Sequence, residues 1–378
     1  MKKAIFCLLL LLALCGCAQQ KEEGLQFPKV TYAKEPMVTL TPEPTPKPDE
    51  LQYRLDVLPV MAEGYAADVA ASHGNTLLVA DTDSRDYQLL WLSLKRNAQG
   101  IPEIQEKKLI RQTPEKPEPE ETYIRAICSD PWGDCYYVLL GEAAPLSMRF
   151  PDGEEPMLQR NEDYQGRYRL ETYSRWGELL SSLSLSNLPV DTVREMLVLK
   201  DGRLFLLGAL QEDWEDEFFP AALTRDVFLT LDAQSGEILH ETVREGCQVA
   251  SLSTDGEKIL CFLRPDGRMI SGFAFLNPAD GSMEALGLAW NHGFLGEPWC
   301  IQSQSPVLRL NNQLKFGTLS SETGEFIEDF DSWPDIISPE AQQRINGTDR
   351  ELRSCCDMGF HLILSLYDSP DLLLLGPA

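Results

Sequence analysis

Two β-prone runs meet across an Asp-Gly turn in the stretch LVLKDGRLFLL, residues 197–207. Asp-Gly between two such runs is the strongest short-range signal for a β-hairpin, because these residues adopt the backbone that a tight hairpin turn requires. The stretch LSTDGEKILCF at 252–262 has the same pattern. Helical periodicity is almost absent from residues 52–378, where short apolar runs alternate with turn residues. The sequence therefore predicts an all-β fold.

Hairpins of this kind recur along the chain at a nearly constant interval. The units begin near Tyr65, Tyr123, Val193, Cys247, Trp299 and Leu352. Successive starts are 58, 70, 54, 52 and 53 residues apart, and four short strands with their loops need about 40–50 residues. We therefore expect residues 51–378 to form a β-propeller of six four-stranded blades. Two β-sandwich domains of three units each are the alternative.

The sixth unit is one strand short, because the chain ends soon after the apolar run at 372–375. Residues 53–60 lie before the first unit and have the pattern of a strand. A closed propeller ring leaves no unpaired sheet edge. We expect residues 53–60 to supply the missing strand and close the ring.

Two of the hairpins resemble those of a known propeller. The stretch STDGEKI at 253–259 is similar to the Ser-Pro-Asp-Gly-x-x-Ile hairpin of the periplasmic propeller of the Tol system, with Thr254 where proline is usual. The stretch LKDGRLF at 199–205 is similar to the same hairpin. This resemblance covers two hairpins of six and describes a turn, so it implies an architecture and no chemistry.

The first seventeen residues have the pattern of a bacterial lipoprotein signal. Lys2 and Lys3 precede an apolar run at 4–14 that is too short to span a bilayer. The sequence LCGC at 14–17 then resembles the lipobox, in which a small residue precedes the cysteine that receives the lipid. Cys17 follows the small residue Gly16, whereas Cys15 follows the bulky Leu14, so Cys17 is the better match to the lipid-bearing cysteine. We expect residues 1–16 to be a signal peptide and Cys17 to carry acyl chains such as palmitate outside the cytoplasm.

Residues 17–50 have the composition of a stalk. The stretch TPEPTPKP at 41–48 alternates proline with polar residues, which favours extended polyproline geometry. Such a segment is typical of a semi-rigid spacer between a lipid anchor and a folded domain. A proline-rich ligand for a partner domain is the alternative.

The charge balance excludes several classes of partner. The chain has 33 Lys and Arg against 59 Asp and Glu, a formal net charge of −26. Sequence-independent binding to nucleic acid depends on basic residues that neutralise phosphates. Electrostatic docking on anionic lipid depends on them too. We therefore expect no nucleic-acid partner and membrane contact only through the lipid on Cys17.

Motifs for catalysis, cofactors and metals are missing from the chain. The four histidines, at 73, 240, 292 and 361, have no zinc-ligand spacing. The chain has no nucleophile elbow, dinucleotide fingerprint or Walker loop. The stretch DTDSRD at 81–86 has the carboxylate density of a calcium loop but lacks the glycine and closing glutamate of an EF-hand. We expect a solvated turn there, and no cofactor or metal.

The cysteines suggest one cross-strand disulfide. Cys128 and Cys135 flank the stretch SDPWGD, and a turn centred between Pro131 and Trp132 would place them opposite each other. Two small buried thiols are the alternative. Cys355 and Cys356 are adjacent on a predicted strand and point to opposite faces, so no bond is expected between them.

An acidic-aromatic loop is the most informative polar stretch. It spans 211–219 between the second and third strands of the third unit. In a propeller these loops and the connections between blades open on one face. The candidate partner-binding residues in such segments are Asp213, Trp214, Glu215, Phe218, Trp290, His292 and Trp333. Loop aromatics with neighbouring carboxylates suit sugar rings, cationic peptides or a protein partner. Tryptophans that fill gaps between blades, beside a solubilising acidic insertion, are the alternative.

Two functions remain open from the sequence. The first is a non-catalytic propeller, anchored to the cell envelope, that binds a protein, a peptide or a glycan. The second is an extracellular carbohydrate-active hydrolase with paired carboxylates at the propeller axis. A buried carboxylate at the centre of the ring is expected of the enzyme, whereas a scaffold is expected to have exposed acids on its rim.

Overall fold

The chain is divided between residues 45 and 46 into two units. A computed structural model describes residues 53–377 of the second unit except for 68, 83, 99, 131–133, 143–145, 150–156, 161–162, 186–187, 213–222, 245–248, 255–258, 264–271, 287–297, 301–306, 311–312, 320–325, 329–351, 358–361 and 367–368. Within these residues no helix is long and apolar enough to cross a membrane.

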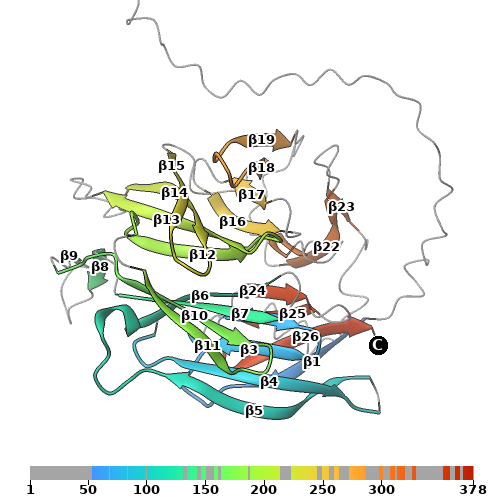
Figure 1. The fold of residues 1–378 in the computed structure, drawn as a ribbon. Coiled ribbons are helices and arrows are strands. Elements are labelled where there is room, and N and C mark those ends of the chain that lie inside the picture. The colour runs from blue at the N-terminus through green and yellow to red at the C-terminus, as the bar shows by residue number, and fades with distance from the viewer. Residues whose placement is uncertain are drawn as a thin grey trace, which may run out of the picture. The chain divides into compact units, whose positions relative to one another are not determined.

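The described residues form six antiparallel sheets of four strands each and one two-stranded sheet (Figure 1). The first sheet has the order β2(Val69–His73), β3(Thr76–Ala80), β4(Gln88–Arg96), β5(Pro102–Gln112). The second has the order β6(Tyr123–Ser129), β7(Cys135–Gly141), β10(Tyr168–Ser174), β11(Leu179–Leu185). A separate hairpin between β7 and β10 consists of β8(Leu146–Arg149) and β9(Met157–Arg160).

The remaining sheets follow the same plan. The third has the order β12(Thr192–Val198), β13(Arg203–Glu212), β14(Leu223–Asp232), β15(Ile238–Arg244). The fourth has the order β16(Val249–Thr254), β17(Ile259–Leu263), β18(Gly272–Leu276), β19(Met283–Leu286). The fifth has the order β20(Pro298–Cys300), β21(Val307–Leu310), β22(Gln313–Leu319), β23(Phe326–Glu328). The sixth has the order β24(Leu352–Asp357), β25(Leu362–Leu366), β26(Asp371–Pro377), β1(Tyr53–Pro59).

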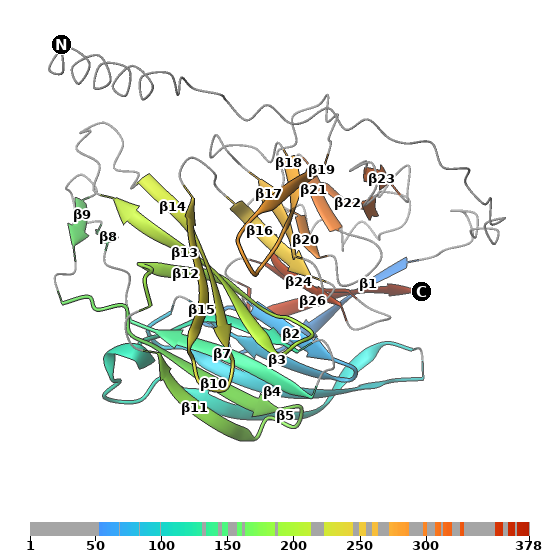
Figure 2. The same ribbon diagram turned by 45° about the horizontal axis from the view of Figure 1, so that its top comes forward.

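The first strands of the six sheets form a closed ring of contacts; Figure 2 shows β12, β16, β20, β24 and β2 from one side of it. β2 contacts β6, β6 contacts β12, β12 contacts β16, β16 contacts β20, β20 contacts β24, and β24 contacts β2. A closed ring of four-stranded antiparallel sheets is a β-propeller, here with six blades. The propeller prediction is confirmed, and the ring excludes the two-sandwich alternative.

The ring is closed by the N-terminal strand, as the sequence predicts. β1 pairs with β26 over seven positions, from Tyr53 opposite Pro377 to Pro59 opposite Asp371. The backbone amides of Val60 and Met61 then donate to the carbonyl oxygen of Pro370, at 3.3 and 2.9 Å. The last blade therefore combines the two ends of the domain, and β26 has no free edge.

The Asp-Gly turn at 201–202 forms the expected hairpin. Leu199 and Arg203 are joined by a 2.9 Å backbone hydrogen bond across the turn. Gly202 has a φ of +83°, a conformation that a side chain disfavours, which explains a glycine at this position. The register places Val198 opposite Leu204 and continues along β12 and β13.

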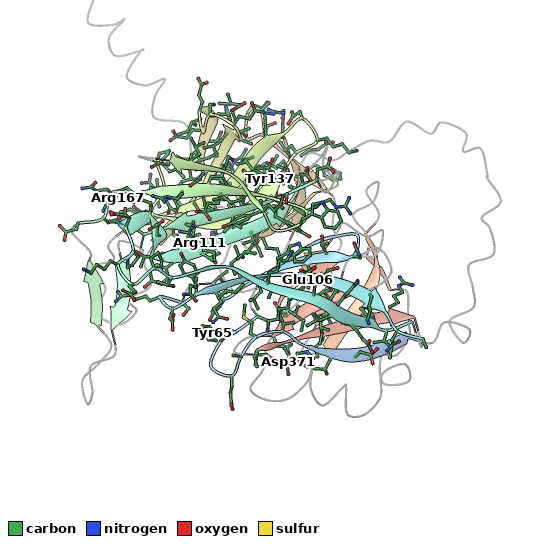
Figure 3. The ribbon with its side chains drawn as sticks, turned by 60° about the horizontal axis from the view of Figure 1, so that its bottom comes forward. Tyr65, Glu106, Arg111, Tyr137, Arg167 and Asp371 are labelled. Atoms are coloured by element: carbon green, nitrogen blue, oxygen red, sulfur yellow. The ribbon has the colours of Figure 1, made fainter. Side chains whose placement is uncertain are left out.

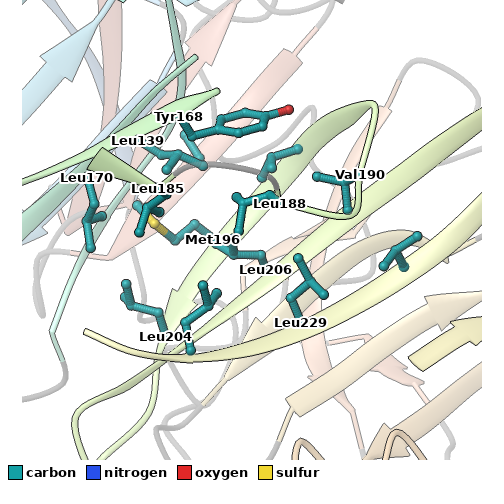
Figure 4. Close-up of a cluster of buried hydrophobic side chains, with 14 of the residues drawn as sticks. Leu139, Tyr168, Leu170, Leu185, Leu188, Val190, Met196, Leu204, Leu206 and Leu229 are labelled. Atoms are coloured by element: carbon teal, nitrogen blue, oxygen red, sulfur yellow. The ribbon is translucent and has the colours of Figure 1, made fainter. Parts of the chain in front are cut away.

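The core lies between neighbouring blades, whose side chains fill the space between the sheets (Figure 3). Alternate residues of β3 show how: Leu77 and Val79 pack toward the sixth blade, whereas Leu78 and Ala80 pack toward the second. Because both faces of a central strand are buried, its sequence is a continuous apolar run. The cluster between the second and third blades includes Leu139, Leu170, Met196, Leu206 and Leu229 (Figure 4).

Trp91 shows that a tryptophan can fill a gap between blades. Its ring is buried in the cluster between the first and second blades. A Cβ on Gly177, in the β10–β11 turn, would lie 2.8 Å from this ring. The indole Nε1 donates to the carbonyl oxygen of Arg175 at 2.9 Å. Trp91 is therefore a packing residue, and the predicted partner-binding tryptophans lie in other segments of the chain.

Candidate functional site

One end of the propeller carries all the connections from second to third strands and from blade to blade. Antiparallel strands alternate in direction, so these two kinds of connection leave a four-stranded sheet at the same end. We call this end the connection face. The innermost strands also begin at this face, because each follows a blade-to-blade connection.

The predicted partner-binding residues fall in such connections by their place in the chain. The segment with Asp213, Trp214, Glu215 and Phe218 lies between the end of β13 and the start of β14. Trp290 and His292 come between β19 and β20, and Trp333 between β23 and β24. All seven lie outside the described residues, and so does Cys17.

The predicted disulfide between Cys128 and Cys135 is not formed, and both thiols are free. The register pairs Cys128 with Tyr137, and Asp130 donates its backbone amide to the carbonyl oxygen of Cys135 at 3.1 Å. The turn is centred one residue later than expected, so the two cysteines lie diagonally. Burial raises the pKa of both thiols. Both cysteines are partly exposed, so the alternative of two small buried thiols does not describe them fully either.

The stretch 81–86 ties the first blade to its neighbours. Asp81 is buried, and its Oδ2 accepts a 3.4 Å hydrogen bond from the backbone amide of Ala66. Arg85 donates from Nε to the hydroxyl of Tyr123 at 2.9 Å. No group of metal-ligating side chains occurs among the residues that the structure describes. The turn is only partly solvated, since Asp81 and Thr82 are both buried.

Five of the six innermost strands share an irregularity near the connection face. In each, one residue is skipped in the pairing with the second strand, while β2 has a regular register. The skipped residues are Arg125 of β6, Arg194 of β12, Ala250 of β16, Trp299 of β20 and Arg353 of β24. A β-bulge of this kind bends the strand and re-aims a side chain, and bulges are frequent beside binding and active sites. We call Arg125, Arg194 and Arg353 the bulge arginines.

Arg125 contacts residues of its own blade. Its Nη2 donates to the carbonyl oxygen of Glu142 at 2.5 Å. Its guanidinium carbon lies 4.6 Å from the centre of the Tyr123 ring, a distance typical of cation–π contact. A Cβ on Gly141 would lie 3.2 Å from Cγ of Arg125 and 2.6 Å from the Tyr168 ring. Glycine in the second strand therefore leaves the space that Arg125 occupies.

Arg194 has an equivalent anchor in the third blade. Its Nη2 forms an ion pair with Oδ1 of Asp226, a carboxylate that is fully buried on β14. The Arg194 side chain itself is 33% exposed. Gly208 lies in the second strand beside this bulge, where a Cβ would approach Val190 to 2.4 Å. The buried carboxylate holds the guanidinium in place while part of it faces water.

Glu142 is enclosed by hydrogen-bond donors. Its Oε1 accepts from the backbone amides of Gln165 and Arg167 at 2.7 and 3.0 Å, and its Oε2 pairs with Arg167 Nη2 at 3.2 Å. The hydroxyl of Tyr164 lies 2.9 and 2.6 Å from the carbonyl oxygens of Val190 and Asp191. The loop that returns to β10 is thus tied both to its own blade and to the third.

A second network at the connection face joins β5, β10 and the 3₁₀ turn η2(Pro119–Glu121). Arg111 pairs with Glu171 at 2.6 Å and with Glu121 at 2.9 Å, and Arg169 pairs with Glu121 at 2.8 Å. Figure 3 labels Arg111 and, at the neighbouring cluster, Arg167. Burial and the Glu171 carboxylate raise the pKa of Tyr173, so its hydroxyl stays protonated and donates to Glu171 at 2.6 Å.

The buried carboxylates of the described residues are therefore engaged as acceptors. They are Asp81, Glu142, Glu171 and Asp226. Each accepts from an arginine or from a backbone amide. All four lie on, or directly after, second and third strands rather than on the innermost strands. This arrangement positions strands and arginines, and it differs from a pair of acids at the centre of the ring.

The bulge arginines were missed by the sequence reasoning, although a signal for them exists. Each follows an apolar residue at the start of a repeat unit, in the triplets Ile-Arg-Ala at 124–126, Val-Arg-Glu at 193–195 and Leu-Arg-Ser at 352–354. Aligning the units on their first strands would place the three arginines in one column. The engaged carboxylates have no comparable signal, because their partners come from distant parts of the chain.

No family model matches the chain, and no curated protein matches it. Solved structures with a similar fold include an acylaminoacyl peptidase in complex with a chloromethyl ketone, at 12% identity and a TM-score of 0.42, where the match covers 80% of this chain and 43% of the peptidase. A Trichoderma reesei carbohydrate-active enzyme of family AA12 matches at 10% identity and 0.47, over 86% and 96% of the two chains. The Neurospora crassa Pan2 WD40 domain matches at 9% and 0.43, over 86% and 94%.

Proposed function

We propose that this chain is a non-catalytic binding module, a β-propeller tethered outside the bacterial cytoplasmic membrane through a lipid on Cys17. Residues 17–50 would act as the spacer, with residues 1–16 removed as a signal peptide. The basis for the tether is the sequence of the first seventeen residues, and the basis for the spacer is the alternation of proline and polar residues at 41–48.

The bulge shared by five innermost strands is the observation that carries the binding role. It recurs at the same register near the connection face, where the blades also carry their longest loops. A bulge bends its strand and re-aims a side chain, and bulges are over-represented next to active sites. Residues on rigid strands give a more precise binding surface than residues on loops alone.

The ligand proposed for this face is a protein, a peptide or a glycan of the cell envelope. The loop residues Asp213, Trp214, Glu215 and Phe218 would contact it, together with the other candidates Trp290, His292 and Trp333. Aromatic side chains supply flat apolar area for such a contact, and carboxylates accept hydrogen bonds from it. The hydrolase alternative gains no support from the described residues, because their buried carboxylates are already held by arginines and backbone amides.

A capture experiment tests the binding role. Residues 51–378 are fixed to beads and challenged with envelope extract and with cell-wall polysaccharides. The double variant Trp214→Ala/Trp333→Ala is expected to lose what the parent retains. Trp176→Ala is the matched control, because Trp176 is 52% exposed in the β10–β11 turn, at the opposite end of its blade. Release of sugar into the supernatant, or equal retention by all variants, would refute the proposal.

A labelling experiment tests the tether separately. The full chain is expressed in a bacterium that is fed radioactive palmitate, and the protein is recovered from membrane and soluble fractions. Cys17→Ser is expected to abolish the label and release the protein from the membrane. Cys15→Ser is the control and is expected to keep both. Label that survives in Cys17→Ser would refute the lipid site.

A further inference from the structure

We propose that the outer edge of β11 is a docking site for an extended, basic strand of another polypeptide, which would add to the second blade as a fifth strand. This surface is made of other residues than those of the proposed binding role, and its occupation requires no reaction.

β11 differs from the other outermost strands in its lack of charge. The free edge of an outermost strand has unpaired backbone groups, and proteins commonly protect such edges with charged side chains. Among the six outermost strands that the structure describes, β1, β5, β15, β19 and β23 each contain at least one charged residue. β11, with the sequence LLSSLSL, contains neither a charged residue nor a proline. Within the described part of the chain β11 pairs only with β10, so its outer edge is available to a further strand.

The exposed side chains of β11 are apolar or small. Leu179 and Leu180 are 54% and 57% exposed, the highest values among the large apolar side chains that the structure describes. A bulge at Leu180 interrupts the pairing with β10, whereas the five residues from Ser181 to Leu185 pair in a regular register. The edge therefore offers a regular run of backbone donors and acceptors with two exposed leucines at one end.

The third blade holds β11 in place on one side. Gly236, in the β14–β15 turn, has a φ of +72°, and a Cβ on it would lie 2.4 Å from Leu185 and 2.9 Å from Leu183. Leu185 is buried in the cluster between the second and third blades. A strand that is already ordered loses little conformational entropy when another strand adds to it. In such strand addition the backbone hydrogen bonds supply affinity, and alternate side chains supply specificity.

The charge of the propeller favours a basic partner. Residues 1–50 contain six basic and six acidic residues, so the net charge of −26 belongs to residues 51–378. Two exposed acids lie beside the edge: Glu178 directly precedes β11, and Glu237 follows Gly236 in the turn that approaches Leu185. Arg175 in the β10–β11 turn offsets one of these charges, so most of the attraction comes from the propeller as a whole. A basic strand is attracted by that field, whereas a second copy of the propeller is repelled.

The competing explanation is an outer strand that tolerates exposed leucines and binds nothing. In that case no strand-forming peptide would bind, and a lysine on β11 would change only the net charge of the protein. The test must therefore vary the charge of the peptide, its ability to pair as a strand, and the edge itself.

The probe is the synthetic peptide KTVTVTVTK, labelled with rhodamine, titrated with residues 51–378 and followed by fluorescence anisotropy. Saturable binding is expected, weaker at high salt because screening reduces the attraction. The control peptide ETVTVTVTE keeps the strand pattern and reverses the charge. A second control, KTVTPTVTK, contains a proline, which cannot donate a backbone hydrogen bond to the edge. Both controls are expected to bind at least about tenfold more weakly.

Variants locate the binding on β11. Leu180→Lys and Ser182→Lys each place a charge on the edge and are expected to weaken the binding of KTVTVTVTK about tenfold, as the loss of one or two hydrogen bonds does. Leu109→Lys is the matched control, because Leu109 is 50% exposed on β5, the outermost strand of the first blade, and the change in charge is the same. All three substitutions are at exposed positions, so the thermal midpoints are expected to equal that of the parent.

Several outcomes would overturn the inference. They are no saturable binding of KTVTVTVTK, equal affinity for the three peptides, equal affinity in the parent and both β11 variants, and an equal loss in Leu109→Lys. Sedimentation equilibrium of the unlabelled parent tests the second copy as occupant, and a dimer that Leu180→Lys separates would overturn the choice of partner. The proposed binding role keeps its own test, since Trp214→Ala/Trp333→Ala leaves β11 unchanged.

Discussion

Removal of β1 is expected to unfold the propeller, because this strand closes the ring. A chain that begins at residue 62 lacks seven paired positions of β26 and the buried side chains of Leu58, Val60 and Met61. Full burial of such a side chain contributes about 1.5–3 kcal/mol, so the hydrophobic loss alone is about 5–9 kcal/mol. A whole domain is stable by only about 5–15 kcal/mol.

The assay is urea denaturation followed by far-ultraviolet circular dichroism, with the chain that begins at residue 51 as the parent. The shortened chain is expected to lack a folded baseline, or to associate through the exposed edge of β26. A synthetic peptide of residues 51–61, added in excess, is expected to restore the transition by binding as β1. Leu58→Ala, which keeps the backbone pairing, is the milder control and is expected to cost about 2–4 kcal/mol.

One result would refute this reasoning. If the shortened chain unfolds at the same urea concentration as the parent and with the same slope, β1 contributes nothing to the folded state. The sixth blade would then be complete with three strands, and the closure of the ring would lie elsewhere.

Three further predictions concern the site and its surroundings. Arg194→Ala is expected to lower the free energy of unfolding by about 3 kcal/mol. This is the low end for a broken buried ion pair, because Arg194 is partly exposed. Adding Asp226→Asn should recover more than half of that loss in urea denaturation, and strictly additive losses would contradict the coupling of the two residues. Gly141→Ala places a Cβ 2.6 Å from the Tyr168 ring and is expected to cost about 1–3 kcal/mol, measured by thermal unfolding, where an unchanged midpoint would count against the geometry. Burial raises the pKa of Tyr137 to about 12 from its ordinary value of 10. Its contribution to stability should therefore be complete below pH 10 and disappear between pH 10 and 12, and replacing this tyrosine with phenylalanine should make that decline shallower in denaturation curves recorded across the range.

The sequence alone was sufficient for the architecture because its signals are local. The Asp-Gly turn at 201–202 specifies a hairpin through the backbone of two residues, and the observed hydrogen bond between Leu199 and Arg203 agrees with it. The spacing of the six units predicts the number of blades, and the strand pattern at 53–60 predicts closure. The turn and the strands depend on neighbouring residues, and the number of blades depends on the length of the repeat. Both kinds of signal can be found in the sequence alone.

Register is the first feature that the sequence did not determine. A turn centred one residue later moves Cys135 from Cys128 to Asp130, and the expected disulfide is lost. The sequence around the turn permits both centres, so the energy of the whole hairpin decides between them. The bulges at Arg125 and Arg194 are register shifts of the same kind. The repeat spacing shows that their two units are equivalent, but it does not show that either strand is bulged.

The partners of the buried charges were decided only by the tertiary structure. Asp226 and Arg194 are 32 residues apart, and Arg111 and Glu171 are 60 apart. Nothing local marks these carboxylates among 59 acidic residues. The sequence by itself determined the strands, the turns, the repeat and its closure, because these follow from the chemistry of adjacent residues. Which arginine holds which carboxylate became fixed only when the strands packed, because burying a charge requires a partner that the chain can bring from far away.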